Sequence, residues 1–327
     1  MNLVCEEFPP VTIEVEQVCC PGCASLKHKS LTQSQDFDYF TTNMIFRIVR
    51  CSECHLIYIN PRPSLREIEK IYPEEYSAYQ FSQIKNPIIR KARFLMQASK
   101  AKKILKCIRQ INNNTNIVDV GCGSPVLLNL LQENSPEKIN LYGNDFNPNT
   151  LKLVEKMGFE TMPGNFEDVD WKKDFFDMIV MNQVIEHLFD IPAVLRKSFS
   201  LLKPAGTLLI ETPSADGLDS RIFRKYHWGG YHIPRHLQIF TSETISTTLK
   251  KYGFEVETIS YLPSPNFWTS SFRNLFFIKG FPRFITKRMN YKNVFCMALF
   301  TSLDLLTRKF CPTSNMRVIA RKSESLT

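Results

Sequence analysis

Four cysteines near the N-terminus form two C-x-x-C pairs, Cys20–Cys23 and Cys51–Cys54, with 27 residues between the pairs. Each pair offers two thiolates from one tight turn, and two such turns suit a tetrahedral zinc ion. The intervening residues are rich in aromatic and β-branched side chains, which favour strands. The pattern therefore predicts a zinc ribbon, with two unrelated thiol pairs or a redox pair as the alternative. Four protein ligands would close the site, which favours folding over catalysis.

A second chemical signal is the sequence Asp119-Val-Gly121-Cys-Gly123-Ser, which joins a short apolar run to a run of helical spacing. Glycines at such a turn let a ligand lie against the backbone. A P-loop would need Gly-Lys-Ser or Gly-Lys-Thr, which do not occur, and a dinucleotide fingerprint would need a small residue where Val126 stands. Asp145, about twenty residues further on, is placed to accept both hydroxyls of a ribose.

Histidines gather in two stretches that follow expected strands. Glu186 and His187 follow one strand, and residues 224–240 contain three of the chain's six histidines within 17 residues. We expect His187 or His236 to act as a general base, with a capping or core histidine as the alternative for His187. Glu186 would orient His187 or bind a divalent ion. Arg235 would clamp an anionic group or form a salt bridge to the core.

These residues need a sheet that brings them together, and the pattern from Ile117 onward alternates strands with helices. In a parallel α/β sheet, ligands bind beyond the carboxyl ends of the strands. We expect a helix that begins at Thr241 and strands at 117–120, 140–144, 159–162, 177–182, 206–211, 254–261 and 315–321.

The polar loop at 112–116 is the clearest domain boundary. We expect five parts in all. They are a zinc ribbon (1–62), a helical connector (63–115), a cofactor-binding core (116–262), an aromatic and basic helical insertion or lid (263–314), and the last core strand with a tail (315–327).

The glycine turn and the segments around it resemble class I S-adenosylmethionine-dependent methyltransferases. The matching segments are "LYGNDFNP", "GNFEDVDW", "FDMIVMNQVIEHL" and "LLKPAGTLLIETP". The cysteine pairs and "PRHLQIFT" resemble a bacterial subgroup often found in sugar, polysaccharide and natural-product pathways. The resemblance implies an α/β fold: a Rossmann-like, seven-stranded methyltransferase sheet with an N-terminal zinc ribbon and a helical insertion before the last strand.

The resemblance also implies roles for individual residues toward S-adenosylmethionine. Asp119 would face the methionyl amino group, Gly121 and Gly123 would flank the cofactor, and Asp145 would bind the ribose hydroxyls. The remaining cofactor contacts would be Asn165 and Phe166 at the adenine, with Phe166 against the ring, and Asn182 and Gln183 below the sulfonium.

Pro125 stands where members of this family usually have a third glycine. Ser124 can cap the following helix and Pro125 can take its first position, where a missing N–H costs nothing. We therefore expect the turn to form.

The charge of the chain is concentrated toward its C-terminus. Residues 266–327 hold eleven Lys or Arg against two acids. This surplus accounts for the whole net charge of +9, so the charges of the other residues cancel. Basic residues interleaved with aromatics at 263–314 suit a membrane surface, and a helical lid is the alternative. No run approaches the ~20 apolar residues of a bilayer-spanning helix. We expect a cytoplasmic protein, with peripheral membrane contact through 263–314 as a further expectation.

The predicted function is methylation, at carbon or oxygen, of a small molecule or a glycan or natural-product precursor, including sugar-linked substrates. An RNA methyltransferase with a zinc ribbon is the enzymatic alternative. Nucleic acid is the weaker expectation, because the fourth strand ends in Asn182-Gln-Val-Ile, without the Pro-Pro-Tyr of base-methylating enzymes. The third alternative is a cofactor-binding scaffold without turnover.

Overall fold

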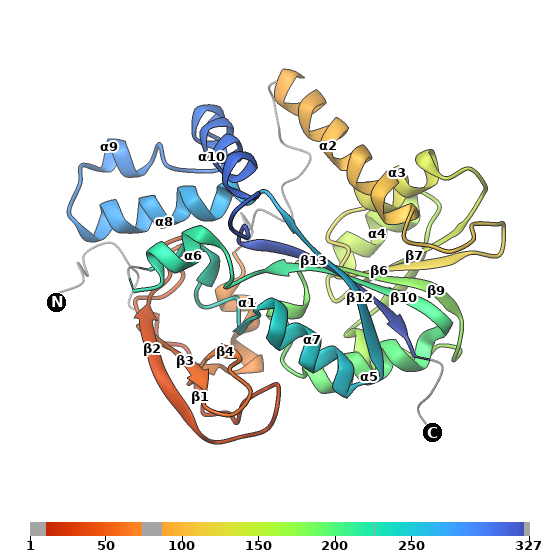
Figure 1. The fold of residues 1–327 in the computed structure, drawn as a ribbon, viewed down its shortest axis with the longest axis horizontal. Helices are drawn as coiled ribbons and strands as arrows, with labels where there is room; N and C mark the ends of the chain where they lie inside the picture. The colour runs from red at the N-terminus through yellow and green to blue at the C-terminus, as the bar shows by residue number, and fades with distance from the viewer. Residues whose placement is uncertain (1–10, 74–86, 226, 324–327) are drawn as a thin grey trace.

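The computed structural model describes residues 11–73, 87–225 and 227–323. The first ten residues of the expected ribbon, residues 74–86 of the expected connector, Tyr226 and the last four residues of the tail lie outside the described residues. A large sheet with helices on both faces lies beside a smaller N-terminal sheet (Figure 1).

The large sheet has seven strands in the order β12-β13-β10-β9-β6-β7-β8. All neighbouring pairs are parallel except those that β13 makes with β10 and β12, which are antiparallel. The predicted seven-stranded α/β sheet is therefore confirmed. Its strands are β6 (Asn116–Val120), β7 (Asn140–Asp145), β8 (Glu160–Pro163), β9 (Phe176–Asn182), β10 (Leu202–Pro213), β12 (Phe254–Leu262) and β13 (Asn315–Lys322).

Both faces of this sheet are covered, which explains why its central strands are almost continuously apolar. On one face, Ile117 and Val180 pack against α3 (Val126–Asn134) and α4 (Pro148–Lys156). On the other face, Val118 and Met181 pack against α5 (Ile191–Leu201) and α7 (Ser242–Lys251). The alternation of neighbouring residues between two clusters is the period-two pattern of strands.

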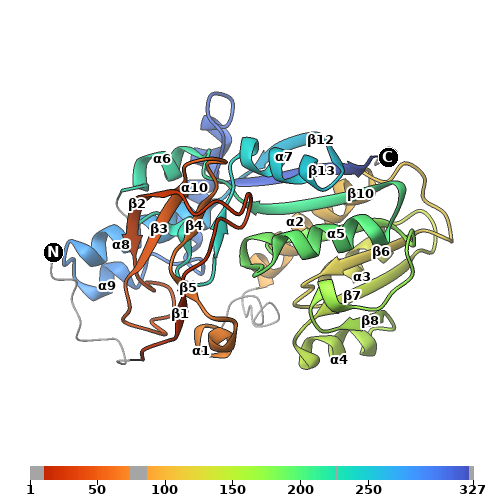
Figure 2. The ribbon, with the colours of Figure 1, turned by 90° about the horizontal axis from the view of Figure 1, so that it is seen from below.

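The smaller sheet is built mainly from the segment that carries the cysteines. Its order is β11-β4-β3-β2, from β2 (His28–Ser34), β3 (Phe46–Cys51), β4 (Ile57–Ile59) and β11 (Gln238–Ile239). A separate pair joins β1 (Val15–Glu16) to β5 (Arg62–Pro63). Because β11 comes from the segment after β10 and pairs with β4, the N-terminal sheet shares backbone hydrogen bonds with the segment that follows β10. Figure 2 shows β2, β3 and β4 on one side of the molecule and β6, β7 and β8 on the other.

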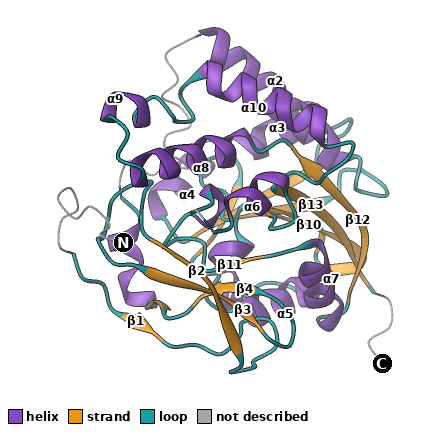
Figure 3. Ribbon diagram, turned by 60° about the vertical axis from the view of Figure 1, so that its left-hand side comes forward, coloured by secondary structure: helices purple, strands orange, loops and turns teal. Residues whose placement is uncertain are grey.

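Helices make up the connector and the insertion. The connector contains η1 (Leu65–Glu67), α1 (Ile68–Ile71) and α2 (Pro87–Leu105), and the segment after β10 contains α6 (Leu218–Phe223) and η5 (Gly229–Tyr231). The predicted insertion before the last strand is confirmed as α8 (Pro265–Ile278), α9 (Arg283–Thr286) and α10 (Val294–Thr307). Helix α8 packs against α6, η5 and α10 (Figure 3).

A buried acid fastens α10 to the start of α8. Asp304 accepts hydrogen bonds from the Trp268 indole at 2.8 Å and from the Ser264 backbone N–H at 2.5 Å. The Phe300 ring stacks on Trp268 with a centroid distance of 5.8 Å. This face of α10 is therefore committed to the fold.

Candidate active site

The glycine turn lies where the order of the large sheet reverses. From β6 the chain proceeds to β7 and β8 on one side, and then returns to β9 and β10 on the other. Such a switch point leaves a crevice at the carboxyl ends of the strands, where ligands of open α/β sheets bind. Asp119 and Asn182 are placed at this edge by β6 and β9.

The turn needs its glycines. Gly121 and Gly123 have φ values of +61° and +58°, a left-handed conformation that favours glycine. A Cβ on Gly121 would lie 2.8 Å from a methyl carbon of Val184. The turn therefore packs directly against the segment that leads into Glu186 and His187.

The helix after the turn begins one residue later than predicted. Helix α3 starts at Val126 with Pro125 at its N-cap, and no side chain caps it. The prediction that Ser124 caps this helix and that Pro125 occupies its first position is therefore wrong. Pro125 takes the capping position itself, so Ser124 lies one residue outside the helix.

Asp145 is fixed in orientation by the turn. One carboxylate oxygen accepts the Gly123 N–H at 2.9 Å, and the other accepts the Asn147 N–H at 2.8 Å. Burial raises the pKa of this carboxyl group. Each oxygen of a carboxylate has a further lone pair, so two ligand hydroxyls can still be accepted.

Asp119 belongs to a buried charged network that the sequence analysis did not include. The Lys100 ammonium from α2 lies 2.7 Å from the Asn182 side-chain oxygen and 2.6 Å from a Glu211 carboxylate oxygen. Arg317 of β13 binds the other Glu211 oxygen. Burial raises the pKa of Asp119 to about 7, Lys100 opposes this rise, and the Asp145 and Glu211 carboxylates add to it.

The other residues assigned to the cofactor are less exposed to the crevice than expected. Phe166 is only 3% exposed and belongs to the core beside α5, while the Asn165 amide donates to Asp168 at 3.1 Å. Gln183 has a φ of +58° and its amide donates to Asn315 at 3.1 Å. Stacking of Phe166 on adenine would need the loop to rearrange, and it stays a prediction.

The structure brings the two candidate bases together. The rings of His187 and His236 have a centroid distance of 4.8 Å, although the two residues lie far apart in the sequence. His187 Nδ1 lies 2.9 Å from the Arg235 carbonyl oxygen, and His236 Nδ1 lies 2.8 Å from the Gly230 carbonyl oxygen. A carbonyl only accepts, so each Nδ1 carries the proton and each Nε2 keeps a lone pair.

Both histidines are neutral at physiological pH. Desolvation lowers the pKa of His187 to about 3 and holds that of His236 well below its ordinary value. The Tyr72 hydroxyl lies 2.9 Å from His187 Nδ1, a contact across 115 residues that the sequence analysis missed. The cluster thus contains two imidazoles that can accept a proton through Nε2, with a phenol beside one of them.

Glu186 does not orient His187 as one alternative predicted. Its side chain is fully buried, and one oxygen accepts the Thr212 hydroxyl at 3.0 Å while the other has no partner among the described residues. Burial raises the pKa of Glu186 to about 8. Ligand atoms of Glu186, His187 and His236 lie within 4.8 Å of one another, so the alternative of a divalent ion is compatible with this geometry.

Arg235 is not an anion clamp. Its guanidinium is fully buried, donates to Asp36 at 2.8 and 3.2 Å, and lies 4.5 Å from the centre of the Tyr39 ring. The same segment buries Trp228, whose indole donates to Asp219 at 2.7 Å. Among the described residues at 224–240, Arg235 and Trp228 therefore serve packing, and His236 is the one whose ring packs against the His187 ring.

The four cysteines converge at the tips of the N-terminal sheet. Cys20 and Cys54 have a sulfur–sulfur distance of 3.4 Å, Cys23 and Cys51 one of 3.5 Å, and all four sulfurs lie within 4.8 Å of one another. Zinc–sulfur bonds of about 2.3 Å put neighbouring thiolates ~3.8 Å apart in a tetrahedron. These residues fit a four-coordinate zinc ion without a large shift.

The four thiols can all be ionised at once only when a cation balances their charge. Burial raises the pKa of Cys54 to about 11 and that of Cys20 further. Burial opposes ionisation of Cys51 as well, but hydrogen bonds from the Cys54 and Glu53 backbone N–H groups hold its pKa at about 7. Such a mixed set becomes four thiolates when a divalent soft cation binds.

Comparisons with known proteins match the core of the chain. A family model described as a methyltransferase domain matches residues 90–259, just over half of the 327 residues. The structure of phosphoethanolamine N-methyltransferase 2 from Haemonchus contortus superposes with a TM-score of 0.52 at 14% identity. The superposition covers 82% of this chain and 63% of that one, and it shows a shared fold.

Two curated relatives match shorter parts of this chain. Sterol 24-C-methyltransferase of Debaryomyces hansenii is 26% identical over 162 residues, which are 45% of this chain and 42% of that protein. Ubiquinone biosynthesis O-methyltransferase of Rhodopseudomonas palustris is 26% identical over 113 residues, which are 34% and 43% of the two chains. The chain thus spans less than half the length of these curated relatives.

Proposed function

We propose, from the premise that this chain belongs to the methyltransferase domain family, that it transfers a methyl group from S-adenosylmethionine to a small-molecule acceptor. The family predicted from the glycine turn and its neighbouring segments is confirmed. The observation that supports the proposal is the close approach of the Gly121 turn to Val184, because the chain continues from Val184 into Glu186 and His187, whose ring lies against His236. The two curated relatives act, by their names, on a sterol and in ubiquinone biosynthesis, which favours a small molecule.

S-adenosylmethionine supplies an electrophilic methyl group when it is bound. Gly121 and Gly123 let the cofactor approach the backbone, and Asp145 accepts the ribose hydroxyls. Asp119 accepts from the methionyl amino group. Asn182 and Gln183 would line the crevice below the sulfonium, and Asn165 would lie at its adenine end, with Phe166 against the ring after the loop rearranges.

The acceptor loses its proton to one of the two histidines. A neutral imidazole with Nδ1–H held by a carbonyl presents the Nε2 lone pair to a hydroxyl or to an acidic C–H bond. Either C- or O-methylation is compatible with this base. The second histidine discourages protonation of both rings at once, because two imidazolium ions 4.8 Å apart would repel each other.

Turnover with candidate small molecules, followed by the release of S-adenosylhomocysteine, tests this proposal. Methylation of an RNA with salt-sensitive binding, and no methylation of small molecules, would replace it with the RNA methyltransferase alternative. Cofactor binding without any turnover across an acceptor panel that includes sugar-linked compounds would favour the scaffold alternative.

Cofactor binding should weaken in mild acid because of Asp119. Its pKa of about 7 means that a growing fraction carries a proton below pH 7, and this proton must leave before the ligand ammonium binds. For one such group the dissociation constant of S-adenosylhomocysteine should rise about eightfold from pH 7.5 to pH 6.0. Calorimetry at the two pH values measures this ratio. The Asp119→Asn variant should bind more weakly and show a smaller ratio, and an equal ratio in both proteins would contradict the assignment.

We also propose that the four cysteines bind one structural zinc ion. The support is the convergence of four sulfurs from two knuckles, each followed by a residue with positive φ, Ala24 at +63° and His55 at +63°. All four ligand positions are filled by protein, so the ion has no open position for a substrate. Its role is to hold the N-terminal sheet, which β11 joins to the core.

Cys20→Ser should lower the zinc content from about one ion per chain to a small fraction, since a missing thiolate sharply weakens a four-thiolate site. The melting temperature should fall as well, because Cys20 is buried in the core shared by both sheets. Elemental analysis with thermal unfolding measures both effects. Cys19→Ser is the matched control, because Cys19 is exposed. Loss of zinc in the control, or full zinc content in Cys20→Ser, would overturn the ligand set.

A further inference from the structure

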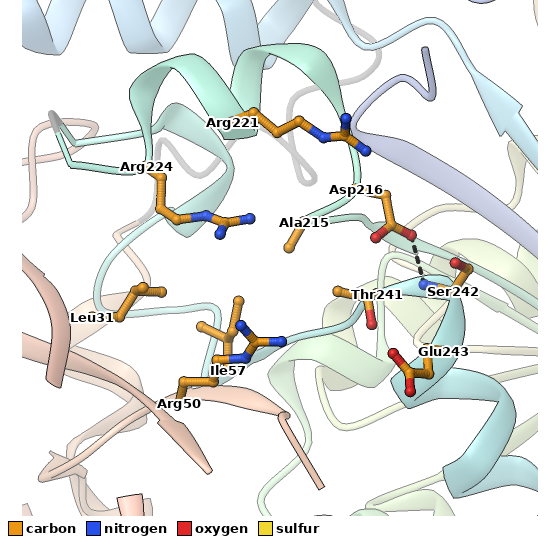
Figure 4. Close-up of a pocket in the computed structure, with 10 residues that line it drawn as sticks. All are labelled: Leu31, Arg50, Ile57, Ala215, Asp216, Arg221, Arg224, Thr241, Ser242 and Glu243. Carbon is orange, nitrogen blue, oxygen red and sulfur yellow. Dashed lines mark hydrogen bonds between the residues drawn. The ribbon is translucent and has the colours of Figure 1, made fainter. Parts of the chain in front are cut away.

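A pocket of about 260 Å³ lies between the N-terminal sheet and the segment that follows β10. Its walls come from β3 and β4, from Ala215 and Asp216 after β10, from α6, and from the start of α7 (Figure 4). Ile57 on β4 lines this pocket, and it also belongs to a closely packed group of residues that includes His236. Ile57 therefore borders both the pocket and the surroundings of a proposed base.

Three arginines from two segments of the chain line this pocket. Arg50 belongs to β3, Arg221 to α6, and Arg224 follows α6. The guanidinium groups of Arg50 and Arg224 point into the same space from opposite walls (Figure 4). None of the three has an ion pair with a described residue.

Five other described arginines, by contrast, bind carboxylates within the fold: Arg62, Arg235, Arg273, Arg317 and Arg321. The three arginines at the pocket lack such partners among the described residues, and like charges that line one pocket repel unless an anion binds between them.

The two acids of the pocket form no ion pair with these arginines, and the three cations outnumber the two carboxylates. One Asp216 oxygen accepts both the Ser242 N–H at 2.7 Å and the Tyr261 hydroxyl at 3.0 Å. Glu243, on the first turn of α7, is exposed and has no ion pair with a described residue. Ser242 N–H is occupied by Asp216 and Thr244 N–H by Thr241, so the arginines rather than the helix end would hold a ligand.

We propose that this pocket binds a phosphate or diphosphate group carried by the methyl acceptor. Guanidinium groups match phosphate oxygens in bidentate hydrogen bonds, and three of them suit the charge of a diphosphate. The inference rests on the proposed function, because it takes the acceptor to be the bearer of this group. The same phosphate chemistry would also bind the free anion.

Titration calorimetry at low salt tests the pocket with inorganic pyrophosphate and, in a second arm, with uridine diphosphate. Both probes should bind with submillimolar dissociation constants. The double variant R221Q/R224Q should weaken both by at least ~tenfold, since each charge-assisted hydrogen bond contributes over 1 kcal/mol. Arg308→Gln is the matched control, because Arg308 is exposed on α10 with no ion pair to a described residue, and it should bind like the wild type.

S-adenosylhomocysteine binding should be unchanged in these variants, which separates this test from a failure of the cofactor site. Tighter binding of uridine diphosphate than of pyrophosphate assigns the pocket to an esterified phosphate, and the reverse order would overturn the assignment to the acceptor. Equal affinity in the wild type and in R221Q/R224Q would overturn the pocket itself. Arg50→Gln adds a third variant, with zinc content measured because Arg50 precedes Cys51.

A different observation concerns the outer face of α10. Phe295, Leu299, Leu306 and Phe310 are 88, 64, 70 and 86% exposed, and their spacing puts them along one side of the helix and its C-terminal end. The opposite side of α10 packs on α8 through Phe300 and Asp304. We call these four residues the α10 face, and no described residue covers it.

Exposed positive charge is concentrated in the same insertion as the α10 face. Six exposed basic residues of the insertion have no ion pair with a described residue, and the segment from 279 to 310 contains Asp304 as its one acid, which is buried. Apolar side chains flanked by cations complement an anionic lipid surface. The six residues are Lys279, Lys287, Arg288, Lys292, Arg308 and Lys309.

We infer that the α10 face docks this protein on anionic bilayers. No helix among the described residues is long and apolar enough to cross a membrane, so the contact is peripheral. Sedimentation with vesicles of phosphatidylcholine and phosphatidylglycerol tests this. The protein should bind these vesicles and bind pure phosphatidylcholine much less, because the charges contribute about 1 kcal/mol each near an anionic surface.

The variant F295S/L306S should reduce vesicle binding at least ~tenfold, since two large side chains would no longer be buried in lipid. Leu26→Ser is the matched control, because Leu26 is 80% exposed on the N-terminal segment. No binding to anionic vesicles would overturn the inference. A dimer of the free protein that F295S/L306S dissociates would also overturn it, because a second copy would then cover the face.

Discussion

Asp145→Ala should abolish the binding of S-adenosylhomocysteine while the protein keeps its zinc. Asp145 ends β7 and is held by the Gly123 and Asn147 N–H groups, so its remaining lone pairs face the crevice in a fixed direction. Loss of two hydrogen bonds to a charged acceptor costs about 3–6 kcal/mol, which weakens binding at least ~100-fold. Calorimetry with wild type and variant side by side measures this loss.

Asp145 also fastens the glycine turn, so the variant needs a control for local folding. Asp145→Asn keeps one oxygen that can accept from the Gly123 N–H, but its NH2 group cannot accept from the Asn147 N–H, and it loses the charge that two ribose hydroxyls require. This variant should lower the melting temperature less than Asp145→Ala does and still bind at least ~tenfold more weakly than the wild type. Asp170→Ala is a second control, because Asp170 is exposed and is not among the residues assigned to the cofactor. Wild-type affinity in Asp145→Ala would mean that the cofactor binds elsewhere.

Replacing the base should remove turnover and leave cofactor binding intact. His187→Ala and His236→Ala should each bind S-adenosylhomocysteine like the wild type, and at least one should lower kcat at least ~100-fold. The reason is geometric: both rings present Nε2 from one cluster, and the Nδ1 atoms are held by carbonyl oxygens of Arg235 and Gly230. Rates measured with saturating cofactor and acceptor decide which ring is the base.

Glutamine variants separate the base from a structural role. His187→Gln and His236→Gln can still donate to the neighbouring carbonyl, so the fold is kept while the proton acceptor is lost. His28→Ala is the matched control, because His28 is exposed on β2 far from this cluster in sequence. Full activity in both glutamine variants would contradict the base assignment. Activity that a chelator removes and an added divalent ion restores, at constant zinc content, would assign the cluster with Glu186 to a metal ion instead.

Local sequence patterns were sufficient for the large sheet. The strands at 117–120, 140–144 and 177–182 are apolar runs bounded by turns, and the structure has them within one residue of these bounds. A strand that is buried on both faces must be apolar at nearly every position. Its sequence therefore predicts a strand even when the neighbouring strands and helices are unknown. The glycine turn was readable for a similar reason, since its left-handed residues restrict the side chains allowed there.

Contacts between distant segments were not readable in the same way. Lys100 belongs to a basic helix, and nothing in its spacing distinguishes it from the exposed lysines at 102 and 103. The structure turns it inward because Glu211 and Asn182 lie beneath α2. Tyr72 contacts His187 across 115 residues of sequence, and Arg235 contacts Asp36 across 199. The residue types alone therefore did not predict which side chains these residues would contact.

The division between ribbon and core was equally hidden. Residues 238 and 239 form a strand of only two residues, too short for a period-two pattern, yet they extend the N-terminal sheet. This small contribution places His236 and the N-terminal sheet side by side. The three arginines of the pocket come from both parts and become neighbours for the same reason.

Titration of S-adenosylhomocysteine into the zinc-assayed, folded protein tests the central claim most directly. The account predicts one site per chain with a micromolar dissociation constant, because the turn, Asp119 and Asp145 are all in place at the switch point of the sheet. No heat of binding up to millimolar ligand at pH 7.5, with one zinc per chain present, would contradict it.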